Sequence, residues 1–168
     1  YETLYHLVWD EFADWYIEAS NSDTNQSVLV YCLLSILKLA HPFAPFVTEV
    51  IWQTFAKKDE VLAVAPWPKK TAEGDATKSN EFEQIVRIVT EVRHLLTVLK
   101  VKKPVLVHEH NEFLISHGEL IAKLAGLKDV QSVEKGSGLK ILLPGYDIWL
   151  DVPDQKVDDY KNQIEDRL

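Results

Sequence analysis

The stretch that decides the fold reads LAHPFAPFVTEVIW and occupies residues 39–52 of the 168-residue chain. Pro42 ends the apolar helix before it, because proline lacks the N–H that the next turn needs and its ring clashes with the preceding turn. Pro45 lies where a first-turn proline is tolerated, since that N–H has no helical partner in any case. The stretch therefore predicts a helix end, a tight corner and a new helix that runs to about Phe55.

We expect this corner to be buried and its residues to be structural. Phe43, Phe46 and Trp52 would fill the hydrophobic core. In this prediction Phe43 and Trp52 share one cluster with two aromatic residues of the first helix, Trp9 and Phe12. None of these side chains is expected to contact a ligand.

Helical periodicity continues on both sides of the corner. Apolar residues recur at three- and four-residue steps over residues 3–20, and nearly every residue from Val28 to Ala40 is apolar, which is typical of a central bundle helix. Asp23 predicts the N-cap of that second helix. Asn80, followed by Glu83, predicts the start of a fourth helix of about twenty residues. Its expected core positions are Phe82, Ile85, Val89, Val92, Leu96 and Leu99.

Shorter elements follow Pro104. The pattern predicts a helix over residues 112–125 that ends at Gly126, and strands over 105–109, 130–133, 139–143 and 146–152. We therefore predict a mainly α chain that begins with a four-helix bundle over residues 1–100, with a linker at 57–79. A small α+β (β-α-β-β-β) subdomain over 101–152 and the start of a C-terminal helix over 153–168 would follow.

Composition limits the function classes. Lys and Arg number 18 against 26 Asp and Glu, and the formal net charge of −8 argues against indiscriminate binding to nucleic acid or anionic lipid. One cysteine, Cys32, excludes an internal disulfide and a multi-cysteine zinc site. The longest apolar run, residues 28–34, is too short to span a bilayer. We expect a soluble, cytoplasmic chain and, because it contains no methionine and opens on Tyr1, a fragment of something larger.

The sequence contains no phosphate loop, no His-Glu-x-x-His and no nucleophile elbow. His108 and His110 could present both rings on one strand face to a metal, but no third ligand is suitably spaced, so we favour two exposed strand residues. We expect no catalytic residue, no metal and no cofactor in this chain.

Charge is unevenly distributed along the sequence. Residues 1–37 hold six acidic side chains and no Lys or Arg, whereas residues 57–103 hold ten basic side chains against seven acidic ones. One interpretation is a solvated surface with ion pairs such as Arg87 with Glu91. The other is the phosphate-facing side of an RNA-binding bundle. Its candidate contacts are Arg93 and Lys100, which share a helix face, together with Arg87, Lys57 and Lys58.

Two segments carry a family resemblance. Residues 9–18, WDEFADWYIE, resemble the opening helix of the anticodon-binding domain of class Ia aminoacyl-tRNA synthetases, and residues 39–52 resemble its Leu-His-Pro-Phe signature. Within this class the valyl-tRNA synthetase family is the most similar. Residues 65–68, APWP, are similar to its Pro-Trp-Pro segment, and residues 89–98 resemble its Ile-Arg-x-Ile-Arg helix. Arg93 is retained there, whereas Thr90 stands where the first arginine is expected.

The resemblance implies a monomeric tRNA-binding fragment whose partner is tRNA-Val, with neither DNA nor a membrane as partner. It also implies that the last helix begins a coiled-coil arm, and that ATP binds to a catalytic domain outside this chain. The His-Ile-Gly-His and Lys-Met-Ser-Lys-Ser motifs of that domain are absent, so we expect no amino-acid activation here. The alternatives are the matching region of an isoleucyl- or leucyl-tRNA synthetase, or a free-standing helical scaffold that binds proteins.

Overall fold

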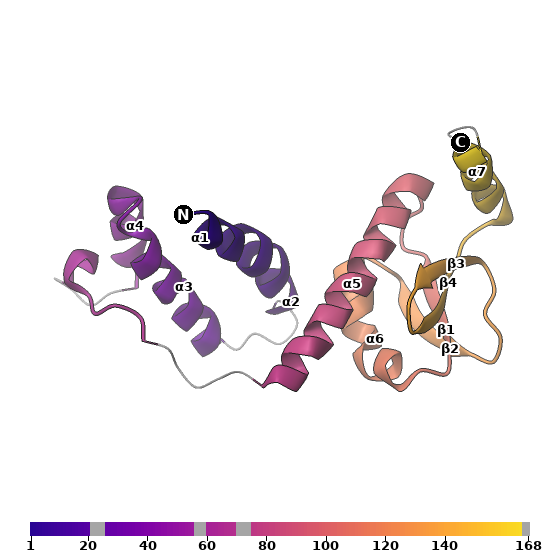
Figure 1. Ribbon diagram of the computed structural model, residues 1–168, viewed down its shortest axis with the longest axis horizontal. Helices are drawn as coiled ribbons and strands as arrows, with labels where there is room; N and C mark the ends of the chain where they lie inside the picture. The colour runs from indigo at the N-terminus through magenta and orange to yellow at the C-terminus, as the bar shows by residue number, and fades with distance from the viewer. Residues whose placement is uncertain (21–25, 56–59, 70–74, 166–168) are drawn as a thin grey trace. The chain divides into compact units, whose positions relative to one another are not determined.

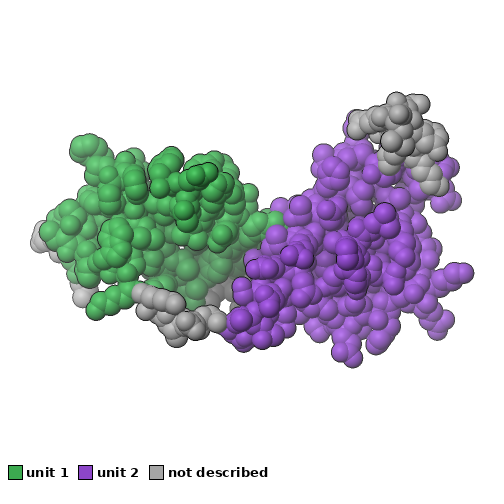
Figure 2. Space-filling model, in the orientation of Figure 1, with its two compact units in different colours: residues 1–73 green, residues 74–168 purple. Residues whose placement is uncertain are grey.

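The computed structural model describes residues 1–20, 26–55, 60–69 and 75–165, with the side chains of 161–165 excepted. The predicted N-cap Asp23 and the candidate contacts Lys57 and Lys58 lie outside the described residues. The chain divides into two compact units, residues 1–73 and residues 74–168 (Figure 2).

The first unit is helical. Its first helix consists of α1 (Glu2–His6), η1 (Leu7–Ile17) and α2 (Glu18–Ser20), and it lies beside α3 (Gln26–Ala40) (Figure 1). Burial and the neighbouring Cys32 thiol of α3 raise the pKa of Tyr16. The periodic apolar residues of the first helix are only partly covered: η1 adopts the wider π-helical turn, and none of its residues is buried.

The corner after α3 forms as predicted, and hydrogen bonds from its polar residues hold it. Pro45 opens α4 (Pro45–Trp52) as the first helical residue. The Thr48 hydroxyl donates to the carbonyl of Ala44 at 2.8 Å and lies 2.9 Å from Nδ1 of His41. Since a hydroxyl has one proton, the His41 ring must be the donor in that second contact.

Glu49 fastens the segment that follows α4. Its carboxylate accepts the backbone N–H of Leu62 at 3.0 Å, and Gln53 donates to the carbonyl of Glu60 at 2.8 Å. These bonds hold η2 (Leu62–Val64), a single 3₁₀ turn, against α4. Leu62 is buried there, whereas Val61 and Val64 on either side of it are exposed.

The predicted aromatic cluster at the corner is wrong. Trp52 is 7% exposed and packs with Leu37 and Leu62. Phe43 is 58% exposed, and its ring makes an edge-to-face contact with the Tyr1 ring at a centroid distance of 5.9 Å. The exposed side chains also include Phe46 of α4 and Trp9 of the first helix. The physical reason is that Glu49 holds η2 against α4, so that Leu62 packs on Trp52. Leu62 thus occupies the space that aromatic side chains were expected to fill.

The second unit begins with α5 (Ala76–Leu99). The predicted start at Asn80 is five residues too late, because Asp75 is the N-cap and its carboxylate accepts the N–H of Thr77 at 2.9 Å. The fully buried residues of α5 are Ile85, Ile88, Val89, Val92, Leu95 and Leu99, whereas the predicted core residues Phe82 and Leu96 are half-buried.

A four-stranded sheet completes this unit with the order β2-β1-β4-β3. β1 (Val105–Glu109) is parallel to β2 (Asp129–Val133), and the connecting helix is α6 (Glu112–Ala125). β4 (Tyr146–Asp151) lies antiparallel to both β1 and β3 (Leu139–Leu143). α6 packs against β2, and α5 packs against α6 and β3 (Figure 1).

Two helix boundaries in this unit, the end of α6 and the start of α7, match the prediction from the sequence. Gly126 ends α6 with a φ of 70°, which an L side chain rarely adopts, and the N–H of Leu127 bonds back to the carbonyl of Ala122 at 2.8 Å. The last helix, α7 (Asp154–Glu165), starts directly after Pro153. In the described parts, no helix is both long and apolar enough to cross a bilayer.

The fold is thus mainly α with a small α+β region, as predicted, and the four strands and α6 are confirmed to within a residue or two. The packing of α5 on α6, β3 and α7 assigns α5 to the second unit. The four-helix bundle over residues 1–100 and the separate parts 101–152 and 153–168 stay predictions.

Candidate nucleic-acid interface

Arg93, the first candidate contact, lies on α5 with its guanidinium group directed at the end of α6. Its Nε and Nη2 both donate to the carbonyl oxygen of Leu124, at 2.8 and 2.5 Å. The last carbonyls of a helix have no partner within the helix, and a cation there also interacts favourably with the helix dipole. Arg93 therefore caps α6 and joins it to α5.

Lys100 lies one residue beyond α5 and is exposed. Its backbone takes a left-handed conformation, with a φ of 52°, and ends the helix. A hollow of about 160 Å³ adjoins it, lined also by Lys156, Asp159 and Tyr160 of α7. Lys102 and Lys103 follow directly and are exposed, so that the turn after α5 presents three cations within four residues.

Arg87, one and a half turns before Arg93 on α5, is exposed and lies beside a groove. The groove has a volume of about 520 Å³ and is built from α5, the start of α6 and the β3–β4 turn. We call it the Tyr146 groove. Its lining residues are Gln84, Arg87, Asn111, Phe113, Leu143, Pro144, Gly145 and Tyr146. The predicted ion pair of Arg87 with Glu91 is not among the ion pairs found in the described residues.

Two rings and an amide order this groove. The Tyr146 hydroxyl donates to Oε1 of Gln84 at 2.5 Å, which ties β4 to α5. The Phe113 ring lies 6.0 Å from the Tyr146 ring and 4.5 Å from the His117 ring, measured between centroids. Asn111 caps α6, and its side-chain oxygen accepts the N–H of Leu114 at 3.1 Å.

Burial raises the pKa of Tyr146, and the nearby Arg87 cation opposes that rise. The phenol therefore stays protonated at neutral pH and remains a hydrogen-bond donor. Arg87 also lines the groove beside Tyr146, which accounts for its effect on the pKa of the phenol.

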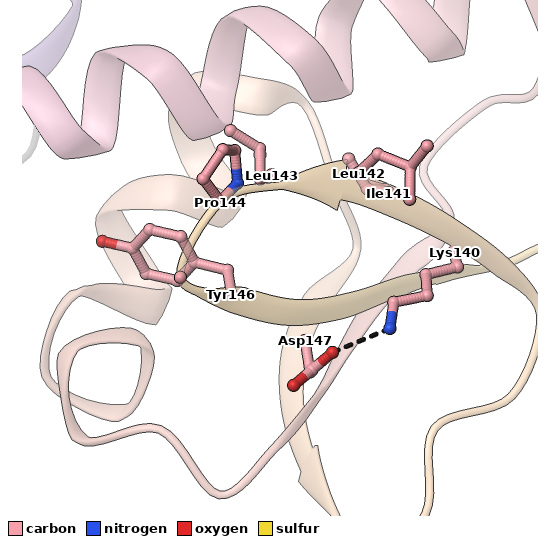
Figure 3. A pocket seen from close by; sticks show the side chains of 8 residues that line it. Lys140, Ile141, Leu142, Leu143, Pro144, Tyr146 and Asp147 are labelled. Carbon is pink, nitrogen blue, oxygen red and sulfur yellow. Dashed lines mark hydrogen bonds and ion pairs between the residues drawn. The ribbon is translucent and has the colours of Figure 1, made fainter.

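The β3–β4 hairpin borders a second hollow, of about 500 Å³, lined by residues 140–147 (Figure 3). Lys140 donates to the Asp147 carboxylate at 2.8 Å and lies 5.2 Å from the centre of the Trp149 ring. The Tyr146 ring extends away from this ion pair (Figure 3). The Lys140 charge is therefore balanced locally, whereas Arg87 makes no ion pair with another residue that the structure describes.

The histidine pair predicted on β1 does not behave as expected. His108 is 1% exposed and lies within the core, whereas His110 is exposed just beyond the strand. The expectation that both are exposed strand residues is therefore wrong for His108. Three consecutive residues of β1, Leu106 to His108, are buried, and because successive side chains alternate between faces, both faces of β1 are covered there. Across the described ranges, no three His, Cys, Asp or Glu side chains are grouped so that they could hold a metal ion.

Sequence reasoning missed the groove residues Gln84, Phe113 and Tyr146. Tyr146 directly follows the Pro144-Gly145 turn, which was a signal that it begins a strand, but its partner Gln84 lies 62 residues earlier in the chain. No local pattern connects positions so far apart.

Comparison with known families settles the class of the first 109 residues. A family model described as the anticodon-binding domain of tRNA ligase matches residues 1–109, which include the corner, α5 and β1. The chain belongs to this anticodon-binding domain family. The match spans all of the first unit and ends before α6, so that most residues of the Tyr146 groove lie beyond it.

Individual relatives of this anticodon-binding domain are valine–tRNA ligases. The valine–tRNA ligase of Listeria monocytogenes is 36% identical over 118 residues, which cover 62% of this chain and 13% of that protein. A chloroplastic/mitochondrial valine–tRNA ligase of Arabidopsis thaliana is 39% identical over 101 residues, covering 54% and 10%. The enzyme of Staphylococcus saprophyticus is 41% identical over 102 residues, covering 54% and 12%. The chain thus spans about an eighth of the length of these relatives.

Proposed function

We propose that this anticodon-binding domain binds tRNA, tRNA-Val in particular, and serves valine–tRNA ligation within a larger enzyme. The observation that carries the proposal is the family match over residues 1–109 together with relatives that are named valine–tRNA ligases. Those names also favour valine over isoleucine or leucine, and a tRNA-binding role over a protein-binding scaffold.

The charge distribution supports a particular RNA-facing side. The exposed cations of α5 and of the turn after it are Lys78, Arg87, Lys100, Lys102 and Lys103, and the exposed acids of α5 include Glu83 and Glu91. The three lysines of the turn have no acidic residue among them. The first helix carries acidic side chains and no Lys or Arg. Because RNA affinity comes largely from phosphate contacts with Lys and Arg, we place the RNA along α5 and the turn after it.

The candidate residues take different roles in this proposal. Arg87 and Lys100 contact phosphates, and Lys57 and Lys58 are expected to add to the same electrostatic attraction. Arg93 acts mainly by holding α6 against α5, since two of its donors are engaged at Leu124. ATP and the ligation chemistry are assigned to other parts of the larger enzyme, which we expect to be monomeric and cytoplasmic.

A titration with a tRNA-Val transcript at low salt tests the proposal. We expect binding that weakens steeply as salt rises. Replacing Lys100, Lys102 and Lys103 together by Gln should lower the slope of log K against log salt by about two to three, which is roughly one for each phosphate that the variant no longer neutralises. Glu11→Ala, on the acidic first helix, is the control and should bind as well as the parent chain or slightly better.

Two results would contradict the proposal. One is no measurable binding of tRNA-Val at about 50 mM salt, a concentration at which phosphate contacts are strong. The other is a triple lysine variant that binds like the parent while Glu11→Ala loses affinity. An isoleucine tRNA that binds equally well would contradict the preference for tRNA-Val.

A further inference from the structure

We propose that the free edge of β3 pairs with the same edge of a second copy of this chain, so that two four-stranded sheets join into one. β3 is an edge strand in the order β2-β1-β4-β3, and Leu139–Leu143 pair with β4 on one side only. The inference adds an interaction surface to this chain and does not depend on the proposed tRNA binding.

The register of the hairpin decides which backbone groups of β3 are free. Leu143 and Tyr146 flank a two-residue turn, so they form a hydrogen-bonded pair of the antiparallel ladder. Because such pairs alternate along the strand, the N–H and C=O groups of Lys140 and Leu142 point away from β4. None of these four groups bonds to another residue that the structure describes. The edge therefore offers two donors and two acceptors.

The other edge strand, β2, is already protected. The carboxylate of Asp129 accepts the backbone N–H of Val130 at 2.8 Å and the side-chain amide of Gln131 at 2.8 Å. Charged side chains on an edge discourage pairing with another chain, whereas an exposed apolar edge favours it. On β3, Leu142 is 87% exposed, and a hollow of about 500 Å³ borders residues 140–147 (Figure 3). β3 is therefore the edge that is open to a partner.

A second copy fits this edge because the edge is self-complementary. In an antiparallel pair with a two-fold axis at Ile141, Lys140 of each chain lies opposite Leu142 of the other. These residues then exchange four backbone hydrogen bonds, and each Leu142 side chain covers the methylene stem of the opposite Lys140. The ammonium group of Lys140 keeps its bond to Asp147.

The neighbouring registers are less favourable. A shift that places Lys140 opposite Lys140 of the other chain sets two like charges against each other. The opposite shift pairs the two Leu142 residues, but it sets Lys140 against Pro144, which has no N–H to donate. The arrangement with Lys140 opposite Leu142 thus makes the most hydrogen bonds without opposing charges.

The size of this contact predicts a weak dimer. Pairing of two five-residue strands buries less than the roughly 1,200–2,000 Å² of a stable interface. We expect a Kd on the order of 100 µM. At micromolar concentrations the chain is then mostly monomeric, which agrees with the monomer expected for the larger enzyme.

Sedimentation equilibrium of the full 168-residue chain tests the proposal, without RNA and from about 10 µM to about 1 mM. Leu142→Pro removes one outward N–H but none of the bonds to β4, since proline is tolerated where the N–H faces away from the sheet. Leu142→Lys places a cation opposite Lys140 of the other copy. Each variant should raise Kd about tenfold or more.

The matched control is Ile115→Lys. It makes the same change of side chain at a residue of α6 that is 55% exposed, and it should leave Kd within about twofold of the parent. Because Leu142→Pro could loosen β3, its urea unfolding curve is recorded alongside. Leu142→Lys, at an exposed position that keeps its N–H, tests the same contact without that risk.

Amide hydrogen exchange locates the contact. The amides of Lys140 and Leu142 should exchange more slowly at about 1 mM chain than at about 10 µM, because they become hydrogen-bonded in the dimer. The amide of Ile141 is already bonded to β4, so its exchange should change less.

Three results would overturn the proposal. One is a chain that stays monomeric at about 1 mM. Another is a dimer whose Kd is unchanged by Leu142→Lys. The third is a dimer that Phe46→Ser dissociates while both Leu142 variants keep it, since Phe46 is 86% exposed on α4 and the contact would then lie in the first unit. The tRNA titration is a separate measurement, so either proposal can fail without the other.

Discussion

Arg93 shows at the scale of one residue how a side chain suited to RNA can be engaged within the protein. Its Nε and Nη2 both reach the Leu124 carbonyl at the end of α6. Arg87, six residues earlier, is exposed beside the Tyr146 groove. The two arginines of α5 therefore differ in environment, and substitutions should separate a structural effect from a binding effect.

We expect Arg93→Ala to lower the free energy of unfolding of the second unit by about 1.5–3 kcal/mol, because a half-buried carbonyl loses charged donors. Arg93→Lys should recover part of this loss. Urea titration followed by circular dichroism measures both variants. Arg87→Ala is the matched control and should stay within about 0.5 kcal/mol of the parent. An Arg93→Ala variant as stable as the parent would show that the cap on α6 contributes nothing.

Tyr146→Phe tests the bond between β4 and α5. At neutral pH the variant should lose about 1 kcal/mol of unfolding free energy, because Gln84 loses the donor to its Oε1. Urea titrations at neutral pH measure this difference. A loss near zero would mean that the bond is exchanged for water at no cost.

The same tyrosine predicts a pH effect. Its pKa is raised in the folded chain, mainly by burial, so the folded state favours the protonated phenol. This contribution to stability is complete below the unfolded pKa of about 10 and is lost as pH rises through the folded pKa. The gap in stability between the parent and Tyr146→Phe should therefore narrow above about pH 10. A gap that stays constant to higher pH would contradict the assignment.

At the scale of elements, the corner between α3 and α4 is held by polar contacts over a small apolar cluster. His41, Thr48 and Glu49 make the hydrogen bonds, and Glu49 extends them to η2. The cluster beneath consists of Trp52, Leu37 and Leu62. The corner thus depends on one buried aromatic residue, and its exposed neighbour Phe43 contributes little to it.

Trp52→Ala should lower the unfolding free energy of the first unit by about 3–5 kcal/mol, the usual cost of truncating a buried aromatic side chain. Phe43→Ala, at a residue that is 58% exposed, should cost less than about 1 kcal/mol. Chemical denaturation followed by tryptophan fluorescence and circular dichroism compares the two. If Phe43→Ala lowered the unfolding free energy more than Trp52→Ala, Phe43 would be buried, as the motif predicted.

The start of α5 is a second test at this scale. Asp75→Ala removes the N-cap bond to Thr77 and should cost about 1 kcal/mol. Asn80→Ala replaces a residue within the helix by a better helix former and should be neutral or slightly stabilising. Urea unfolding of both variants decides between the two starts. If Asn80→Ala lowered the unfolding free energy and Asp75→Ala did not, the helix would begin at Asn80.

At the scale of the whole molecule, the chain combines a family-defining segment with exposed cations on α5 and on the turn after it, in a protein that is acidic overall. The segment covers residues 1–109, and the net charge of the chain is −8. A local basic surface on such a chain attracts phosphate, whereas the acidic remainder limits indiscriminate binding. Specificity would then come from base contacts and not from total charge.

The chain by itself should not catalyse ATP–pyrophosphate exchange with valine or with any other amino acid. Both nucleotide-binding motifs of the class are absent from the sequence, and one of them requires a methionine that the chain lacks. Radiolabelled pyrophosphate exchange measures this, with a protein-free blank as the control. Exchange above the blank that survives repurification would show a nucleotide site that the sequence does not reveal.

The sequence by itself determined the elements and their order. Proline at the corner, glycine after α6 and periodic apolar residues act through steric and hydrogen-bonding effects within a few residues, so they can be interpreted without a fold. The motif at residues 39–52 likewise indicated the family. Start positions were less well determined, as at α5, because Asp75 and Asn80 are both acceptable caps and only packing decides between them.

The tertiary structure alone decided which side chains are buried and which groups meet. Leu62 covers Trp52 in place of Phe43, Arg93 caps α6, and Tyr146 bonds to Gln84 across 62 residues. The physical reason is that burial and hydrogen-bond partners depend on which distant segments pack together. Local patterns set the type of each element, but one amphipathic face fits several partners equally well, and the choice among them is made by the packing of the whole unit.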